Sequence, residues 1–170
     1  MTEMIVGDAG DVLALELWDG AGAGPVAAAL GFALPTAGCS AGDDVCRAMR
    51  FEPNVWLVEG SGVDARALAA AVAGHGAVTA IGGGLVRVTL RGAAWRALLM
   101  HDGVFDAEDV GFGPGRTAAT VIAHVAVRLH VVREDRCDAL VPASLADGLL
   151  ARWRQAAWGL RQAQGERGRS

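Results

Sequence analysis

Histidines and arginines along one alternating stretch are the residues of this chain most suited to chemistry. Ala119–Val132 alternates apolar and polar residues with the period of two that is typical of β-strands, and His124, Arg128 and His130 share its polar face. Two histidines can ligate a metal ion, but His124 and His130 are separated by about 20 Å of strand, too far for one ion. The spacing therefore predicts a polar interface or a solvated face, and no metal site.

Two glycine-rich segments are candidates for phosphate binding through backbone N–H groups. Gly111–Thr117 fails the pattern of a phosphate-binding loop, because position 110 is valine and Arg116 stands where lysine is required. Gly82–Gly84 precedes a predicted strand, whereas a dinucleotide-binding fingerprint follows a strand and opens a helix. We therefore expect no cofactor-binding residue, although Arg116 or Arg128 could clamp a carboxylate.

Composition limits the catalytic side chains. All 15 basic residues are arginine and tyrosine is absent, which excludes a Schiff-base lysine, a phosphate-binding lysine and a tyrosine acid or base. His75 and His101 fall in predicted loops, and acids such as Asp43 and Asp44 fall in polar connections without the burial that tunes a working acid. We expect no catalytic residue in the chain.

Tryptophan supplies a candidate partner surface. The predicted C-terminal helix, which begins at Ser144, carries one apolar stripe: Leu145, Leu149, Trp153 and Ala157. Trp158 lies five residues after Trp153, hence about 140° around the helix, and cannot share that narrow stripe. Because exposed tryptophans are frequent interface anchors, we predict a partner interface formed by His124, Arg128, His130 and Trp158.

Length, charge and cysteine usage bound the class of protein. The 170 residues, 52% of them hydrophobic, suit a single domain over residues 1–161 with a flexible polar tail at 162–170. A formal charge of −4 gives no footprint for nucleic acid or an anionic membrane, and no apolar stretch is long enough to span a bilayer. Met1–Asp11 lacks the basic start of a signal peptide, and three cysteines fit free thiols, so we expect a cytoplasmic protein.

Local patterns predict the elements that position these residues. We expect strands at Val12–Trp18, Val78–Ile81, Leu85–Leu90 and Cys137–Val141, two strands or one bent strand in Ala119–Val132, a hairpin of Arg47–Phe51 with Val55–Glu59, and a loop at Pro35–Asp44. Helices are expected at Pro25–Gly31, from Asp64 to Gly74 or Gly76, at Ala93–Met100 and from Ser144. This order predicts an α+β fold of two ferredoxin-like β-α-β-β-α halves, about 12–76 and 77–160, packed as an internal pseudo-repeat.

Several segments resemble the gamma subunit of heterotetrameric sarcosine oxidase. The N-terminal part of the likeness is Leu34–Gly38, Gly42–Asp43 and Arg47–Val58, which follow that family's pattern LPxPG, GD and LxLGPDEWLL. The later part is Gly76–Thr79, Gly92–Leu99, Gly113–Thr117 and Val141–Trp153. The chain departs from the family pattern at Thr79–Gly83 and at Pro142–Ala143.

The resemblance implies a folate-binding, aminomethyltransferase-like fold and the role of a small auxiliary subunit. The partners would be alpha, beta and delta subunits of a flavoprotein complex, with FAD, FMN, NAD and tetrahydrofolate held by those subunits and no cofactor in this chain. Such a complex oxidatively demethylates sarcosine to glycine, a one-carbon unit and hydrogen peroxide. Two alternatives remain open: a gamma-type subunit of a related N-methyl amino acid oxidase or dehydrogenase, and a stand-alone domain that binds folate or a small acid.

Overall fold

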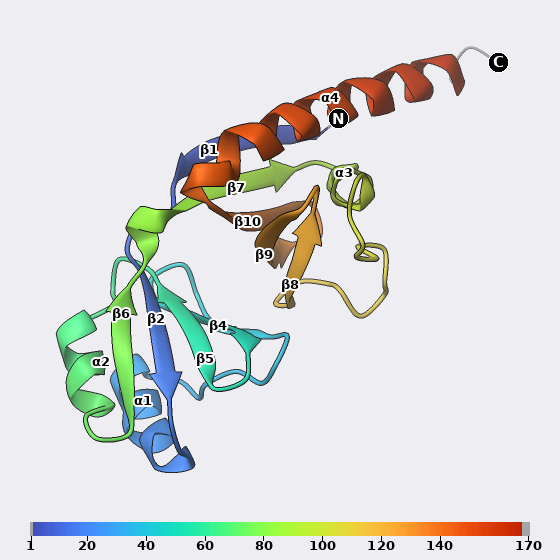
Figure 1. Cartoon of the computed structure of the whole chain (residues 1–170). Helices are drawn as coiled ribbons and strands as arrows, with labels where there is room; N and C mark the ends of the chain where they lie inside the picture. The colour runs from blue at the N-terminus through green and yellow to red at the C-terminus, as the bar shows by residue number, and fades with distance from the viewer. Residues whose placement is uncertain (1, 168–170) are drawn as a thin grey trace.

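The computed structural model describes residues 2–167, whose backbone forms two antiparallel five-stranded sheets (Figure 1). The N-terminal sheet has the order β3 (Ser40–Gly42), β4 (Arg47–Glu52), β5 (Val55–Glu59), β2 (Val12–Leu17) and β6 (Gly76–Ala80). The C-terminal sheet has the order β8 (Thr117–Ile122), β9 (Val125–Arg133), β10 (Arg136–Pro142), β7 (Leu85–Arg91) and β1 (Glu3–Asp8). The fold is therefore of mixed α and β type.

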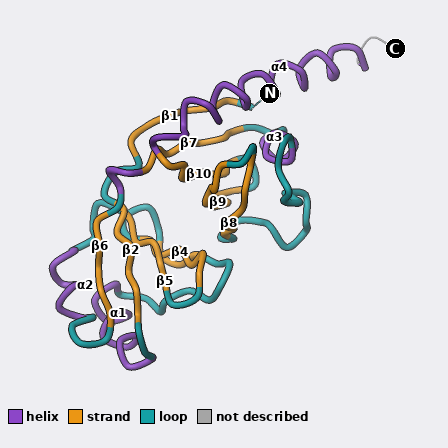
Figure 2. The backbone as a smooth tube through the Cα atoms, in the orientation of Figure 1, coloured by secondary structure: helices purple, strands orange, loops and turns teal. Residues whose placement is uncertain are grey.

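In the described part of the chain, four α-helices cover the outer faces of the sheets (Figure 2). They are α1 (Ala23–Leu30), α2 (Ala65–Ala71), α3 (Trp95–Met100) and α4 (Ala143–Arg167), with short 3-10 turns at Gly20–Gly22 and Gly82–Gly84. The Asp64 carboxylate accepts hydrogen bonds from the N–H groups of Arg66 and Ala67, so the expected N-cap of α2 is confirmed. None of the described helices is long and apolar enough to cross a bilayer.

Alternation along the strands decides which residues enter which core. Val86, Val88 and Leu90 of β7 face α3 and α4, where buried residues from both helices and four strands form the largest apolar cluster. Leu13, Leu15 and Leu17 of β2 face α1 and α2 in a smaller cluster. The opposite faces of the two sheets meet each other through a third cluster: Ala9, Val12, Met49, Leu57 and Leu140.

The alternating stretch at 119–132 folds into two strands joined by a two-residue turn. Ala123 and His124 both have positive φ, +48° and +67°, as a type I′ hairpin turn requires. The turn reverses the chain, so Ile122 and Val125 both reach the core whereas Val121 is exposed. His124 therefore lies at an exposed hairpin tip and not on the strand face of His130.

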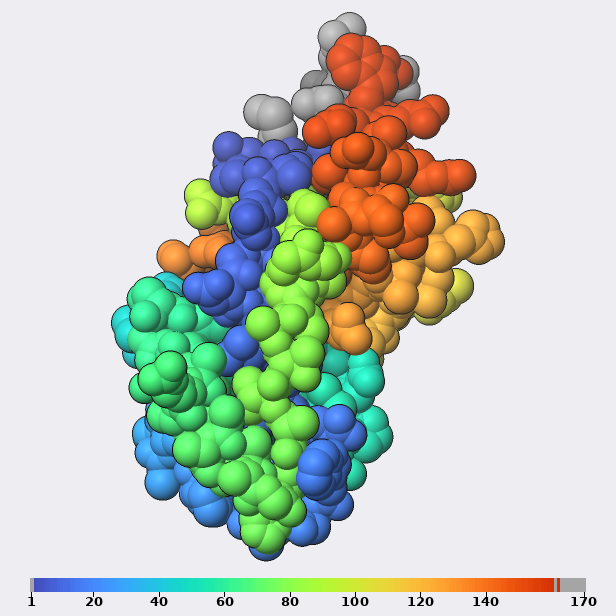
Figure 3. All heavy atoms as spheres, turned by 60° about the vertical axis from the view of Figure 1, so that its left-hand side comes forward, coloured from blue at the N-terminus to red at the C-terminus, as the bar shows by residue number. Residues whose placement is uncertain are grey.

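Two chain segments connect the N-terminal sheet to the C-terminal sheet, and they mark the boundary between the two halves. The chain passes from β1 to β2 through Ala9–Asp11 and returns from β6 to β7 through Ile81–Gly84, and the two segments lie side by side (Figure 3). A Cβ on Gly82 would collide with the carbonyl oxygen of Gly10, so only glycine allows this close approach. The passage thus falls after β6, later than the expected division between residues 76 and 77.

Three elements differ from the expectations. Strand β1, which the sequence analysis did not predict, completes the C-terminal sheet by pairing with β7 along its whole length. Strand β3 lies within the expected loop at 35–44 and pairs with β4. Helix α4 runs to Arg167, through most of the predicted flexible tail, and residues 168–170 lie outside the described residues.

Helix α4 also uses a slightly different face from the one expected. Leu149, Trp153 and Ala157 are buried as predicted, but Leu145 is 48% exposed. The face that packs on the sheet instead continues through Ala146 and Leu150. With 3.6 residues per turn, a strict i, i+4 row drifts around the helix, so the covered face combines spacings of three and four and leaves Leu145 outside it.

Candidate functional site

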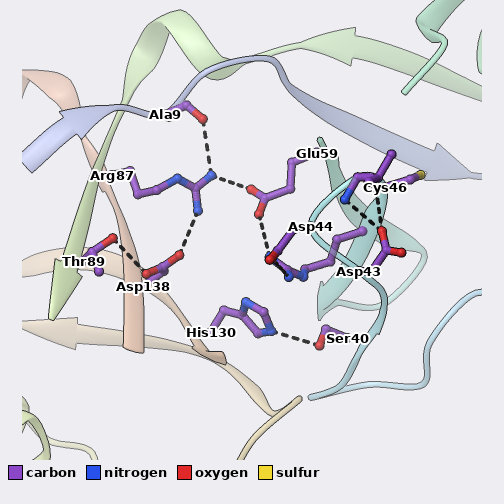
Figure 4. Close-up of polar contacts among 12 residues, drawn as sticks. Ala9, Ser40, Asp43, Asp44, Cys46, Glu59, Arg87, Thr89, His130 and Asp138 are labelled. Atoms are coloured by element: carbon purple, nitrogen blue, oxygen red, sulfur yellow. Dashed lines mark hydrogen bonds and ion pairs between the residues drawn. The ribbon is translucent and has the colours of Figure 1, made fainter. Parts of the chain in front are cut away.

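Polar side chains gather where the helix-free faces of the two sheets meet (Figure 4). Because strand residues alternate, the neighbours of the apolar core positions point between the sheets. This inter-sheet cluster consists of Arg47, Glu59, Arg87, Thr89, His130, Arg136 and Asp138, with Ser40, Asp43 and Asp44 at its N-terminal side. It is the largest collection of buried charge that the described residues contain.

Arg87 links the sheets. Its Nη2 lies 2.5 Å from Oε2 of Glu59 on the N-terminal sheet, and its Nη1 lies 3.5 Å from Oδ2 of Asp138 on the C-terminal sheet. Arg47 approaches the other oxygen of Glu59 at 3.4 Å. The Glu59 and Asp138 side chains are only 10% and 3% exposed, so these ion pairs are poorly screened by water.

Asp138 has further partners on the C-terminal sheet, to which Arg87 also belongs. The Thr89 hydroxyl donates to Oδ1 at 2.9 Å, and Arg136 donates from Nε to Oδ1 at 3.0 Å and from Nη2 to Oδ2 at 2.9 Å. The bidentate geometry is the strong form of an arginine–carboxylate pair, and it raises the pKa of Arg136. Every carboxylate oxygen of Asp138 is therefore occupied by a group of the same chain.

His130 joins β9 to the N-terminal sheet through a neutral hydrogen bond. Its Nε2 lies 2.9 Å from Oγ of Ser40, whose hydroxyl lies 3.2 Å from the Gly115 carbonyl oxygen. The serine has one proton to donate, so the arrangement that satisfies both contacts has Nε2–H of His130 as the donor to Ser40. Nδ1 of His130 is buried without a hydrogen-bond partner.

Burial keeps the His130 ring uncharged. The residue is 4% exposed, and loss of water together with the nearby positive charge of Arg47 lowers its pKa from 6.5 to about 4. At neutral pH the imidazole therefore acts as a hydrogen-bonding group and adds no charge to the inter-sheet cluster.

A cleft of about 330 Å³ opens beside the inter-sheet cluster. Its lining is formed by Ala9, Gly10, Asp11, Asp43, Asp44, Arg47, Glu59, Gly60, Ser61 and Arg87. Asp43 accepts hydrogen bonds from the N–H groups of Val45 and Cys46, and Asp44 pairs with Arg47 at 2.6 Å; each contact lowers the pKa of its carboxyl group. The guanidinium groups in the cleft thus already face carboxylates, and the rim carries negative charge.

Among the side chains that the structure describes, no group of three or more His, Cys, Asp or Glu residues is placed to hold a metal ion. Cys39, Cys46 and Cys137 are free thiols. Burial raises the pKa of Cys46 and, far more strongly, that of Cys137, which disfavours the thiolate form.

The four residues predicted to contact a partner lie in different places. His130 is enclosed between the sheets, and Arg128 donates to Glu52 at 2.9 Å across the same junction. These two therefore meet the other half of their own chain, because the polar face of β9 is covered by the N-terminal sheet. His124 and Trp158 are exposed, and their role as partner contacts stays a prediction.

The two arginines considered as carboxylate clamps are likewise engaged within the chain. Arg116 Nη1 lies 3.0 Å from Sγ of Cys39, and the Arg128 guanidinium pairs with Glu52. Neither lines the inter-sheet cleft.

Sequence reasoning missed the ion pairs of Arg87, Glu59 and Asp138. A signal for one of them was present: in Leu85–Leu90, Arg87 and Thr89 alternate with valine and leucine, which places an arginine on the face opposite the core. The local sequence could not show which residue would cover Arg87, because Glu59 approaches it only when the two sheets pack together.

The fold and the inter-sheet cluster together define a mixed α/β protein of two antiparallel five-stranded sheets joined by an internal ion-pair network. The sarcosine oxidase, gamma subunit family matches residues 15–159. The chain belongs to the sarcosine oxidase gamma subunit family.

A solved structure has the same fold. It is a chain of the heterotetrameric sarcosine oxidase from Corynebacterium sp. U-96 in complex with pyrrole 2-carboxylate, with a TM-score of 0.79 and 23% sequence identity. The match covers 91% of this chain and 83% of that one. No curated protein matches the chain.

Proposed function

We propose that this chain is the small gamma subunit of a heterotetrameric, flavin-dependent sarcosine oxidase. The observation that carries the proposal is the match of the gamma subunit family over residues 15–159. The shared fold with a chain of the Corynebacterium enzyme supports it across nearly the whole molecule. The complex would oxidise sarcosine with O2 and water to glycine, formaldehyde and hydrogen peroxide, or deliver the one-carbon unit to tetrahydrofolate.

The role proposed for this chain is assembly rather than catalysis. In the inter-sheet cluster, the carboxylates of Glu59 and Asp138 are neutralised by Arg47, Arg87 and Arg136, and the pair of Arg87 with Glu59 fixes the two halves in one arrangement, which suits a rigid accessory subunit. FAD, FMN, NAD and tetrahydrofolate would be held by the alpha and beta partners, with a delta subunit completing the assembly. A cytoplasmic location is part of the proposal, and the three free cysteines favour it.

We also propose that the halves are an internal pseudo-repeat of ferredoxin-like units. The support is topological: in each sheet the strand that opens the half, β2 or β7, lies between the strand before the second helix, β5 or β10, and an edge strand, β6 or β1. The edge strand of the C-terminal sheet comes from the start of the chain, so the second unit is closed by β1. In the second unit, β1 thus occupies the edge position that β6, the last strand of the first unit, occupies in the N-terminal sheet.

Affinity purification tests the assignment. The tagged full-length chain would be isolated from its native host, followed by mass spectrometry and an absorbance scan for flavin. We expect flavin-bearing partner chains, and the eluate should produce hydrogen peroxide with sarcosine. Activity restricted to another N-methyl amino acid would assign a related oxidase, and a colourless eluate without partner chains would refute the proposal and leave folate titration of the isolated chain as the next test.

A further inference from the structure

Strand β1 forms one edge of the C-terminal sheet. Its six residues pair with β7 without a register shift, from Glu3 opposite Arg91 to Asp8 opposite Val86. In an antiparallel pair, every second residue directs both its N–H and its C=O towards the neighbouring strand, and the residues between them direct theirs away from it. Among the described residues, no other segment forms a backbone hydrogen bond to the outward groups of β1. The strand therefore presents a regular row of available donors and acceptors.

The other three sheet edges are shorter or partly covered. Strand β3 has only three residues, and β6 has five, none of which is a large exposed hydrophobic residue. Strand β8 is contacted at both ends, because Thr117 donates its N–H to the Gly38 carbonyl oxygen at 2.9 Å and Ile122 forms a β-bridge with Gly103. Among the described edges, β1 is therefore the one that offers a whole strand length for pairing.

The side chains of β1 provide apolar surface on both faces of the sheet. Five of its six residues are exposed, and the exposed fractions of Ile5 and Val6 are 42% and 43%. Val6 lies on the face that α4 covers and Ile5 on the opposite face, because successive residues of a strand alternate. In Figure 3, β1 lies at the surface of the C-terminal half, in blue.

Strand β1 also lacks the features that usually protect an edge. Those features are a charge or a proline in the middle of the strand, or a bulge that twists the edge away. The two charges of β1, Glu3 and Asp8, stand at its ends, and its pairing with β7 is regular throughout. An exposed, regular edge with an apolar centre is the arrangement to which a further strand can be added.

The charges of β1 indicate which strand would pair with it. In a symmetric pair of two copies over the full length, Glu3 of one copy stands opposite Asp8 of the other at both ends, and directly opposed like charges are destabilising. A strand with arginine or lysine at those two positions is stabilised by the same contacts. Its two central residues face Ile5 and Val6, so apolar side chains fit there.

We propose that β1 binds a strand of another subunit of the oxidase complex and so extends the C-terminal sheet, the added strand having two apolar residues at its centre and basic residues at its ends. Main-chain hydrogen bonds supply the affinity, and the side chains opposite β1 supply the specificity. The inference rests on the proposed function, since it takes the partner from the oxidase complex. It goes beyond that function by assigning the contact to one strand and by stating the kind of segment bound.

Hydrogen exchange tests the strand addition directly, because it reports on backbone N–H groups. The tagged full-length chain is compared in isolation and in the complex purified from its native host, and peptides that cover β1 are followed by mass spectrometry. The outward amides exchange freely in the isolated chain and are hydrogen-bonded in the complex, so we expect their exchange to slow by about tenfold or more. Peptides that cover β8 are the internal control. Protection of β1 that is absent, or no greater than that of β8, would overturn the proposal.

A lysine in the middle of the edge tests the same contact in the intact complex. Val6→Lys places a charge where the added strand would lie, and Val121→Lys is its matched control, because Val121 is 44% exposed on β8 at the opposite edge of the sheet. We expect Val6→Lys to lower the flavin retained per tagged chain by about tenfold or more, and Val121→Lys to match the wild type. Equal retention in the two variants, with unchanged melting temperatures, would contradict the assignment of the contact to β1.

Charge reversal tests the kind of strand that binds. Glu3→Lys brings a like charge against a basic-ended strand, so flavin retention should fall severalfold, with the larger loss at low salt. Glu16→Lys, at an exposed position of β2, is the matched control and should retain flavin as the wild type does. In a pair of two copies, Glu3→Lys would instead create opposite charges at both ends. A dimer in sedimentation that Glu3→Lys strengthens, with flavin retention unchanged, would show that the edge binds a second copy and overturn the proposal.

Failure of the proposed function is distinguishable from failure of this inference. A wild-type chain that retains no flavin-bearing partner would refute the proposed function and the strand addition with it. A flavin-bearing complex in which β1 exchanges as freely as in the isolated chain, and in which Val6→Lys has no effect, would overturn the strand addition alone.

Discussion

In the C-terminal half, 21 buried residues fill the space between the sheet and helices α3 and α4, whereas nine fill the equivalent space beneath α1 and α2. The helices over the larger core contribute Trp95 and Trp153 to it. The helices over the smaller core consist mostly of alanine and glycine. The strand orders nonetheless correspond in four of five positions, and the fifth is filled by β6 in one sheet and by β1 in the other. Strand order therefore does not determine the size of the core. Hydrogen bonding within the sheets fixes the arrangement of the strands, and the helix side chains determine how much apolar surface is buried against them.

The difference also suggests how the smaller half is maintained. Its sheet is attached to the larger half through Arg87 and Glu59, and through Ser40 and Thr117, which donate backbone hydrogen bonds to Gly115 and Gly38 across the sheet edges. The N-terminal half thus depends on contacts with its neighbour in addition to its own core.

The largest expected loss of stability comes from shortening a side chain in the larger core. Trp153 is 1% exposed, so Trp153→Ala should leave a cavity and lower the free energy of unfolding by about 4 kcal/mol. Trp153→Phe should cost much less, because the indole N–H is buried without a partner and its removal leaves no new unsatisfied group. Urea unfolding at constant pH measures both, and equal losses would contradict the assigned cavity effect.

The junction between the halves predicts a specific pH dependence. The unfolded His130 ring binds a proton near pH 6.5, but the folded ring does so only near pH 4, so the unfolded state holds more protons between these values. Stability is fully present above pH 6.5 and falls by roughly 3 kcal/mol on acidification to pH 4.

His130→Gln provides the control for this prediction, because glutamine keeps an N–H donor for Ser40 but does not titrate. The difference in unfolding free energy between wild type and variant should shrink from pH 6.5 to pH 4. Parallel pH profiles over that range would show that His130 does not carry the effect. Asp43 and Asp44, whose pKa values are lowered, are common to both proteins and cancel.

Loss of the arginine that bridges the sheets should have a smaller effect. Arg87→Met keeps the aliphatic stem but leaves Glu59 and Asp138 with one cationic neighbour each, and should cost about 2 kcal/mol. Hydrogen exchange should rise more in the N-terminal sheet than in the C-terminal sheet, since the smaller core depends on the junction. A uniform rise in both sheets would argue against that dependence.

The smallest expected loss of stability comes from the N-cap of α2, the helix that covers the small core. Asp64→Ala removes two N-cap hydrogen bonds of α2, each 2.9 Å long, and should cost about 1 kcal/mol. Asp64→Asn, which retains the acceptor, should cost only a few tenths of a kcal/mol. Thermal unfolding followed by circular dichroism compares the two, and equal shifts would mean that the cap is not the stabilising contact.

The sequence was most informative where local rules decide the structure. The hairpin of Arg47–Phe51 with Val55–Glu59 was predicted and is confirmed, since Pro53 and Asn54 specify the turn and Asn54 adopts positive φ. The capping of α2 by Asp64 and the burial of Trp153 follow from equally local signals.

The remainder depends on contacts between distant segments. Strand β1 is a mostly exposed edge strand whose residues show little alternation, and it becomes a strand only because β7 offers an open edge. His130 was placed on a polar face correctly, but the sequence could not show that Ser40 would cover it from a separate sheet. The candidate site likewise depends on contacts between distant segments, because Arg87, Glu59 and Asp138 come from three strands that only the tertiary fold brings together.

The position of β1 has a consequence for the order in which the chain is synthesised. Glu3 pairs with Arg91, so β1 leaves the ribosome before its partner strand, which is made several seconds later at the roughly 5–20 residues per second of translation. During that interval the N-terminal sheet can form around β2, while the backbone of β1 remains unpaired. A nascent chain stalled before Leu85 should therefore carry a β1 segment whose backbone N–H and C=O groups have no β7 to pair with, which makes it prone to aggregation until β7 is made.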